Sequence, residues 1–196
     1  MSPSRSSLVS VLLAIACAPV PAQALPAIDT TGAFTGTCES GVSTVGQVIT
    51  TPKARTKVFA FDFFVGPNNL SLEGGIFEWE PDAGQVIGAP LAVAPASPPD
   101  PSDTTLNGMR ARFEFPSGVP LRRGMSYLIF ANWLGNGDTA PCWLMTPDVY
   151  PGGAGKQIFP PNGIVAGPWS DVFYWPSPSV DWAIRVYFAR DSRHRK

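Results

Sequence analysis

The stretch MRARFEF, residues 109–115, carries the pattern that decides the fold. Apolar and charged residues alternate strictly along it. Successive side chains of a β-strand point to opposite faces, so the stretch predicts a strand with one buried and one solvated face. The buried face would carry Met109, Ala111, Phe113 and Phe115, and the solvated face Arg110, Arg112 and Glu114.

The same period of two recurs elsewhere in the chain. In VFAFDFFV (58–65) it predicts that Phe59, Phe61 and Phe63 share one face of a strand, with Asp62 on the other. In DWAIRVYF (181–188) it again separates an apolar face from a more polar one. No stretch shows a clean helical period with capping residues. The chain is therefore predicted to be built from β-strands.

Two further features fix the class of fold. SYLIFANWL (126–134) is almost wholly apolar, which is typical of a central strand covered on both faces. Turn-forming clusters of Gly, Pro, Asn and Asp separate the strands, and VAPASPPDPSDTTL (93–106) reads as a long surface loop. Many short strands in one domain predict an all-β, single-domain antiparallel β-sandwich of jelly-roll type.

The first 24 residues have the layout of a secretory signal. LVSVLLAIACAPV (8–20) is an apolar run too short to span a bilayer, and Ala22-Gln23-Ala24 supplies a cleavage motif. The alternative is a lipoprotein anchored at Cys17. We expect a signal peptide (1–24), an N-terminal extension (25–43), the β-sandwich domain (44–189) and a basic tail (190–196), with no transmembrane segment in the mature chain.

Composition narrows the classes of partner and compartment. Charged residues make up 15% of the chain and hydrophobic residues 44%, beside 19 Gly and 22 Pro. Removing Arg5 with the signal changes the net charge from −1 to −2. No basic face is visible, which argues against nucleic acid. Cys38 and Cys142 remain after cleavage, and in an oxidising compartment such a pair predicts one disulfide.

Several motifs in order resemble a known group. They are GIFEWEPDAGQVIGAPL (75–91), FEFPSGVPLRRGMSYLIFANW (113–133), Tyr150-Pro151-Gly152-Gly153 and Asp181-Trp182-Ala183-Ile184. Together they resemble secreted bacterial β-sandwich proteins, many of them sorted by a PEP-CTERM surface anchor. The resemblance implies a jelly-roll-like domain at the cell surface or in an exopolysaccharide-rich matrix. Because the chain ends in ARDSRHRK, sorting by that anchor is not expected here.

The sequence offers little for catalysis. The only histidine, His194, lies in the charged tail, and the chain lacks a nucleophile motif, a zinc ligand set and a phosphate loop. The sharpest enzymatic hypothesis concerns Glu78 and Glu80. They share one strand face about 6.8 Å apart, a separation compatible with glycoside hydrolysis. Against it, Phe77 and Trp79 are expected to take the inward face, which would leave both glutamates in solvent.

Two other kinds of site have weak signals. A structural calcium ion would use loop oxygens of Asn136 with Asp138, or of Asp171 with Asp181, although neither pair makes a full ligand set. Asn69-Leu70-Ser71 matches a glycosylation acceptor, but turn chemistry explains it equally well. No resident cofactor and no metal site are predicted.

The aromatic stretch GPWSDVFYWP (167–176) carries the main functional hypothesis. Exposed rings stack on the faces of sugars, and their polar tips add hydrogen bonds. The candidate ligand-binding residues are Trp169, Tyr174, Trp175, Trp133 and Tyr150, with Trp143 as a further candidate. The alternative is that these rings fill the core. The sequence leaves both open.

The resulting expectation is an exported, non-catalytic β-sandwich that is secreted or periplasmic and binds a polysaccharide or cell-surface glycan. A purely structural or protein-interaction module of the cell envelope is the alternative. A glycosidase using Glu78 and Glu80 is a weaker third hypothesis.

Overall fold

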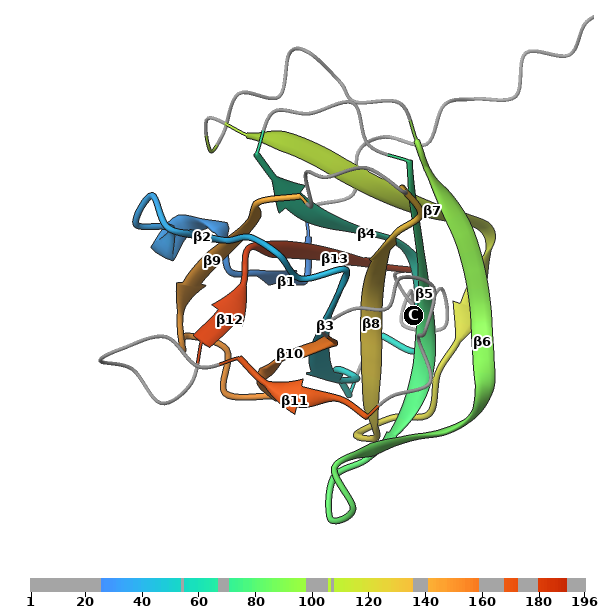
Figure 1. Ribbon diagram of the computed structural model, residues 1–196. Helices are drawn as coiled ribbons and strands as arrows, with labels where there is room; N and C mark the ends of the chain where they lie inside the picture. The colour runs from blue at the N-terminus through green and yellow to red at the C-terminus, as the bar shows by residue number, and fades with distance from the viewer. Residues whose placement is uncertain are drawn as a thin grey trace, which may run out of the picture.

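The computed structural model describes residues 26–53, 55–66, 71–97, 106, 108–135, 141–158, 168–172 and 180–189. Within them the chain is all β, apart from one 3₁₀ turn, η1 (Thr31–Ala33). Thirteen strands form one antiparallel sheet that curls strongly into a half-barrel (Figure 1). The prediction of an antiparallel all-β fold is confirmed. In this described part no helix is long and apolar enough to cross a membrane.

The neighbours in the sheet follow the order β1-β13-β4-β7-β6-β5-β8-β3-β10-β11, while β9 lies off this path and pairs with β12, β2 and β4. The strands are β1 (Ile28–Asp29), β2 (Cys38–Glu39), β3 (Thr44–Thr50), β4 (Lys57–Val65), β5 (Leu72–Glu80), β6 (Gln85–Ser97), β7 (Met109–Pro120), β8 (Ser126–Trp133), β9 (Trp143–Pro147), β10 (Gly155–Ile158), β11 (Ser170–Asp171), β12 (Val180–Trp182) and β13 (Ile184–Phe188).

The curl gives the sheet two walls that face each other across the main core. One wall contains β13, β4 and β7, and the other contains β5, β8 and β3. Strand β6 joins them, because it pairs with β5 along most of its length and with β7 at Ala96 and Ser97. The largest fully buried side chains between the walls include Phe61, Phe63, Phe113, Tyr127, Trp143 and Trp182.

The alternation of MRARFEF predicted its burial correctly. Ala111, Phe113 and Phe115 are buried in the main core, and Met109 packs against it. In β4, Phe61 and Phe63 are also buried. The prediction was wrong for Phe59.

Phe59 is 38% exposed because the ladder between β4 and β7 is irregular at this point. Val58 faces Val119 and Ala60 faces Glu114, so Phe59 has no partner in the register. Between these two pairs β7 has four residues (115–118) and β4 has only Phe59, so the regular ladder is interrupted here and the Phe59 side chain is left outside the core. The run of buried alternating phenylalanines therefore begins at Phe61, two residues later than the sequence suggested.

A second hydrophobic cluster covers the opposite face of the β5–β8–β3 wall. It contains Phe77 and Trp79 of β5 with Leu128 and Phe130 of β8, and Val86 and Trp169 pack against it. Ile129 and Ala131 point the other way, into the main core. Strand β8 is therefore covered on both faces, as its apolar sequence predicted.

Close packing explains one glycine of this wall. A Cβ atom added at Gly75 would lie 2.4 Å from the backbone oxygen of Ala92 and 2.8 Å from the ring of Phe130. A larger side chain would therefore force the paired strands apart. Gly75 lets β6 and the aromatic ring approach the β5 backbone.

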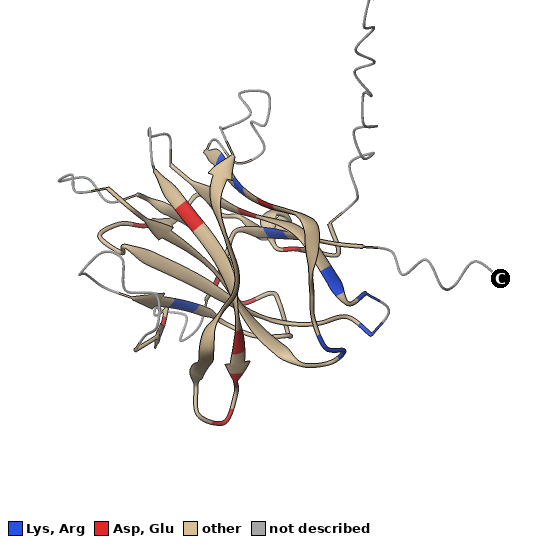
Figure 2. Cartoon of the chain, turned by 90° about the vertical axis from the view of Figure 1, so that its right-hand side faces the viewer, with Lys and Arg blue, Asp and Glu red and all other residues tan. Residues whose placement is uncertain are grey.

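Strand β6 differs from its neighbours in charge. None of its thirteen residues is Lys, Arg, Asp or Glu, and in Figure 2 its ribbon is tan throughout, while acidic segments gather at the β5–β6 turn. Leu91 and Val93 of this strand are exposed, whereas Ala92, Ala94 and Ala96 pack against the main core. One face of β6 therefore supports the core and the other is apolar but open.

The predicted disulfide is confirmed. Cys38 and Cys142 are bonded, with their Cα atoms 5.4 Å apart and 104 residues of separation in the chain. The bond lies next to the pairing of β2 with β9, in which Cys38 faces Leu144. It therefore joins the N-terminal segment to the wall that contains β4 and β9.

Candidate functional site

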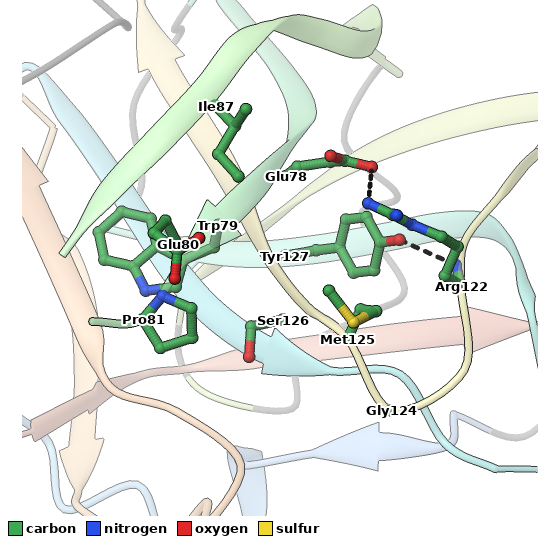
Figure 3. A pocket seen from close by; sticks show the side chains of 10 residues that line it. All are labelled: Glu78, Trp79, Glu80, Pro81, Ile87, Arg122, Gly124, Met125, Ser126 and Tyr127. Carbon is green, nitrogen blue, oxygen red and sulfur yellow. Dashed lines mark hydrogen bonds and ion pairs between the residues drawn. The ribbon is translucent and has the colours of Figure 1, made fainter. Parts of the chain in front are cut away.

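A small hollow lies where the turn between β5 and β6 meets the connection between β7 and β8 (Figure 3). Its volume is about 150 Å³, comparable to a cavity that holds a benzene-sized molecule. The register brings its central residues together, because Glu78 faces Ile87 on one side and Tyr127 on the other. Arg122, in the β7–β8 connection, completes this group.

Arg122 organises the polar side of the hollow. Its guanidinium Nη2 donates to Glu78 Oε1 at 2.8 Å, and its backbone N–H donates to the Tyr127 hydroxyl at 2.8 Å. Figure 3 shows the three side chains converging. Because Arg122 is 65% exposed, this ion pair is screened by solvent and mainly orients the two side chains. Tyr127 is only 1% exposed.

Two other polar side chains that line the hollow have no partner among the described residues. Within the described residues, neither the Glu80 carboxylate nor the Ser126 hydroxyl forms a hydrogen bond or ion pair, and both side chains are half-buried. Ile87 and Met125 add apolar surface and are 46% and 44% exposed. The hollow thus combines acceptors, donors and apolar walls in a volume of about 150 Å³.

The two glutamates do not lie where the sequence placed them. Phe77 and Trp79 are buried as expected, but they face the second cluster, not the main core. Glu78 and Glu80 alternate with them and line the hollow instead of projecting into open solvent. Glu78 is 29% exposed and paired to Arg122. Both glutamates are half-buried, so the expected solvated glutamate face is partly covered, because this face of β5 borders the hollow near the end of the strand.

The predicted aromatic platform is not assembled from the described residues. Trp133 is 7% exposed and lies in the main core with Trp143, so neither offers a free ring face. Trp169 is half-buried against the second cluster, and its buried indole N–H has no acceptor within the described residues. Tyr174 and Trp175 lie outside the described residues.

Tyr150 has a structural role at the C-terminal end of β3. Its hydroxyl accepts from the Thr50 N–H at 3.0 Å and donates to the Thr50 carbonyl at 3.3 Å. Burial raises the pKa of Tyr150 above its ordinary value. The side chain therefore fills the hydrogen-bonding needs of a strand end, which leaves its hydroxyl little capacity for a ligand.

The carboxylates considered for calcium each have their own partners. Asp181 is fully buried and accepts from Gln47 Nε2 at 2.7 Å and from the backbone N–H groups of Val149 and Tyr150 at 2.8 and 2.7 Å. Burial raises the pKa of Asp181 despite these bonds. Asp171 pairs with Lys156 across β10 and β11.

The other residues considered for metal binding or modification are outside the part of the chain that the structure describes. Asn136, Asp138, Asn69 and Cys17 lie outside the described residues. Among the described residues no group of three or more His, Cys, Asp or Glu side chains could hold a metal ion.

Sequence reasoning missed a charge ladder on the outer face of the other wall. In register across four strands lie Asp29 (β1), Arg185 (β13), Asp62 (β4) and Arg112 (β7), with alternating sign. Asp62 is fully buried, and its carboxylate accepts from Arg112 Nη1 at 3.3 Å and from the Tyr187 hydroxyl at 2.9 Å. The only signal in the sequence was one carboxylate in a phenylalanine-rich strand.

Burial dominates the titration of this ladder. Desolvation raises the pKa of Asp62 to about 6, although the neighbouring Arg112 and the hydrogen bond from Tyr187 oppose the rise. Desolvation, together with the Asp62 charge, raises the pKa of Tyr187 to about 12. Arg112 lies over the Tyr187 ring, 4.5 Å from its centroid. The charged side chains of the ladder pair with one another. In the hollow, by contrast, Glu80 and Ser126 have no side-chain partner among the described residues.

Neither a scan against protein-family models nor comparisons with curated proteins and with solved structures find a match to this chain.

Proposed function

We propose that the protein is an exported, non-catalytic β-domain that binds a glycan, and that the hollow beside Glu78 and Arg122 receives one sugar ring. The observation that carries this proposal is the set of side chains in the hollow. The free carboxylate of Glu80 accepts hydrogen bonds, Arg122 and the Tyr127 hydroxyl donate them, and Ile87 offers an apolar contact. A few convergent polar groups beside apolar walls are typical of small-molecule sites.

We further propose that the domain is a jelly-roll-like β-sandwich that functions outside the cytoplasm. Two walls facing each other across one core support a jelly-roll-like sandwich, similar to the secreted bacterial proteins of the PEP-CTERM-sorted group. The Cys38–Cys142 disulfide supports an oxidising compartment outside the cytoplasm. The alternative of a lipid anchor at Cys17 concerns a residue outside the described part.

The test is binding of the purified protein to a panel of immobilised polysaccharides and soluble oligosaccharides. Glu80→Gln and Arg122→Ala should weaken binding, while Glu39→Gln serves as the matched control because it makes the same change on β2, remote from the hollow. Trp169→Ala tests the aromatic stretch separately. If only Trp169→Ala reduces binding, while its thermal unfolding is unchanged, the ligand surface is at Trp169 and the hollow is not the site.

A structural or protein-interaction module is the second candidate function. The burial of Trp133 and Trp143 and the bonding of Tyr150 to β3 favour it, because they remove aromatic rings from the surface. Absence of binding to every glycan of the panel would put this candidate first.

Glycoside hydrolysis remains a weaker third hypothesis because Glu78 and Glu80 line the same hollow. Release of reducing sugar from a bound polysaccharide, abolished in Glu78→Gln, would establish it. A glycan that is bound but not cleaved supports the non-catalytic proposal.

A further inference from the structure

The hollow has an excess of one carboxylate. Glu78 is already paired with Arg122 at 2.8 Å, whereas Glu80 has no hydrogen-bond or ionic partner within the described residues. Lys156, which lies 5.4 Å from the ring centroid of the neighbouring Trp79, is also engaged, because it pairs with Asp171. A negative charge is therefore left unbalanced at the rim of a small, half-enclosed site.

The Tyr127 hydroxyl of the hollow also has no described acceptor for its own proton. The Tyr127 hydroxyl accepts the Arg122 backbone N–H at 2.8 Å, and no described residue accepts its own proton. The side chain is 1% exposed and lines the hollow. A buried hydroxyl that keeps an unused donor is costly unless something accepts it. An oxygen atom of a bound molecule would meet that need.

We propose that the sugar ring bound in the hollow carries a protonated primary amine, as in a residue of a de-N-acetylated amino-sugar polymer. This inference rests on the proposed function. The ammonium group would lie at Glu80 and a ring hydroxyl would accept from Tyr127, while the C–H face of the ring would contact Ile87 and Met125. A volume of about 150 Å³ leaves room for a single ring, which favours a chain end over an internal residue.

The same charges select against other glycans. A uronic acid would bring a second carboxylate beside Glu80, while Arg122, the one cation that lines the hollow among the described residues, is already paired with Glu78. A neutral sugar would satisfy Tyr127 but would leave Glu80 with uncharged donors. An N-acetylated amine would lose its charge and add bulk to a hollow that has little spare space.

The experiment compares the affinities of glucosamine oligomers with those of N-acetylglucosamine and glucose oligomers of equal length, by calorimetric titration at low and high salt. An exposed ion pair contributes little, so the expected preference for the amine is about two- to fivefold, decreasing with salt. Glu80→Gln should remove the preference while weaker binding of the neutral oligomers persists. Glu39→Gln should keep it.

The outcomes separate the inference from the proposed function. Equal affinity for all three oligomers, unchanged in Glu80→Gln, would overturn the amine assignment and leave a glycan site. No binding of any oligomer would overturn the amine assignment, and absence of binding to the whole polysaccharide panel would overturn the proposed function as well. An amine preference that survives Glu80→Gln, or that Glu39→Gln reduces equally, would show a general attraction to the acidic protein and would also overturn the assignment.

Discussion

Asp62 makes the stability of the protein depend on pH in an unusual direction. Its carboxyl is buried, and desolvation raises its pKa from 3.8 to about 6. The folded protein therefore holds a proton on Asp62 in a range of pH where the unfolded chain has lost it. The stability that protonated Asp62 contributes is fully present below pH 3.8 and is lost as the pH rises through about 6.

The magnitude follows from the size of the shift. A difference of about 2.2 between the two pKa values, at 1.36 kcal/mol for each unit, corresponds to about 3 kcal/mol of unfolding free energy. Asp62→Asn replaces the carboxyl with a neutral group of the same shape. We therefore expect the unfolding free energy of the wild type to fall by about 2.4 kcal/mol relative to this variant between pH 4 and pH 7, because part of the effect is already lost at pH 4.

Urea unfolding followed by tryptophan fluorescence at fixed pH values measures this difference. Other titrating groups are shared by the two proteins, so they cancel in the comparison. Asp82→Asn makes the same change at an exposed turn and controls for the loss of one negative charge. A wild-type to Asp62→Asn difference that stays constant from pH 4 to pH 8 would refute the argument that burial governs this residue.

Three further predictions concern the scaffold. Replacing Cys38 and Cys142 together by Ala should destabilise the protein by about 2–4 kcal/mol, because the loop is long, and reduced wild type should match the variant in urea unfolding. Gly75→Ala should lower the free energy of unfolding by about 1–3 kcal/mol, because its Cβ would lie 2.4 Å from a backbone oxygen. Gly32→Ala is the control: nothing lies close to its Cβ, so the free energy of unfolding measured by thermal unfolding should change by no more than about 0.5 kcal/mol. Asp181→Ala should cost about 3 kcal/mol because it leaves buried donors without an acceptor, and amide hydrogen exchange should become faster in the loop after β9; unchanged exchange there would contradict this.

Local patterns of the sequence predicted those features that depend on neighbouring residues. The alternation in 109–115 identified Ala111 and Phe113 as core residues, because the strand is regular there. The apolar run 126–134 predicted a strand covered on both faces for the same reason. The pair Cys38 and Cys142 was predicted by elimination, since no other cysteine follows the signal segment.

The hollow could not be predicted because its residues meet only through pairings between distant strands. Glu78 and Tyr127 are directly opposite in the β5–β8 ladder, and Arg122 reaches them from a connection. Phe59 shows a second limit, since a bulge in the register leaves no trace in the alternation of residue types. Asp62 was visible as an isolated carboxylate, but its neighbours in the ladder depend on the strand order.

The pairing of the first strand with the last has a consequence for how the chain assembles. β13 lies between β1 and β4, with Ile28 opposite Val186, and the Thr30 hydroxyl donates to the Trp182 carbonyl and accepts from the Ile184 N–H. Contacts between such distant residues make folding slow. The edge of β4 that pairs with β13 stays without this partner until residues 184–188 have been synthesised. That interval, before β13 pairs with β4, is when the chain is most exposed to aggregation through its unpaired strand edge.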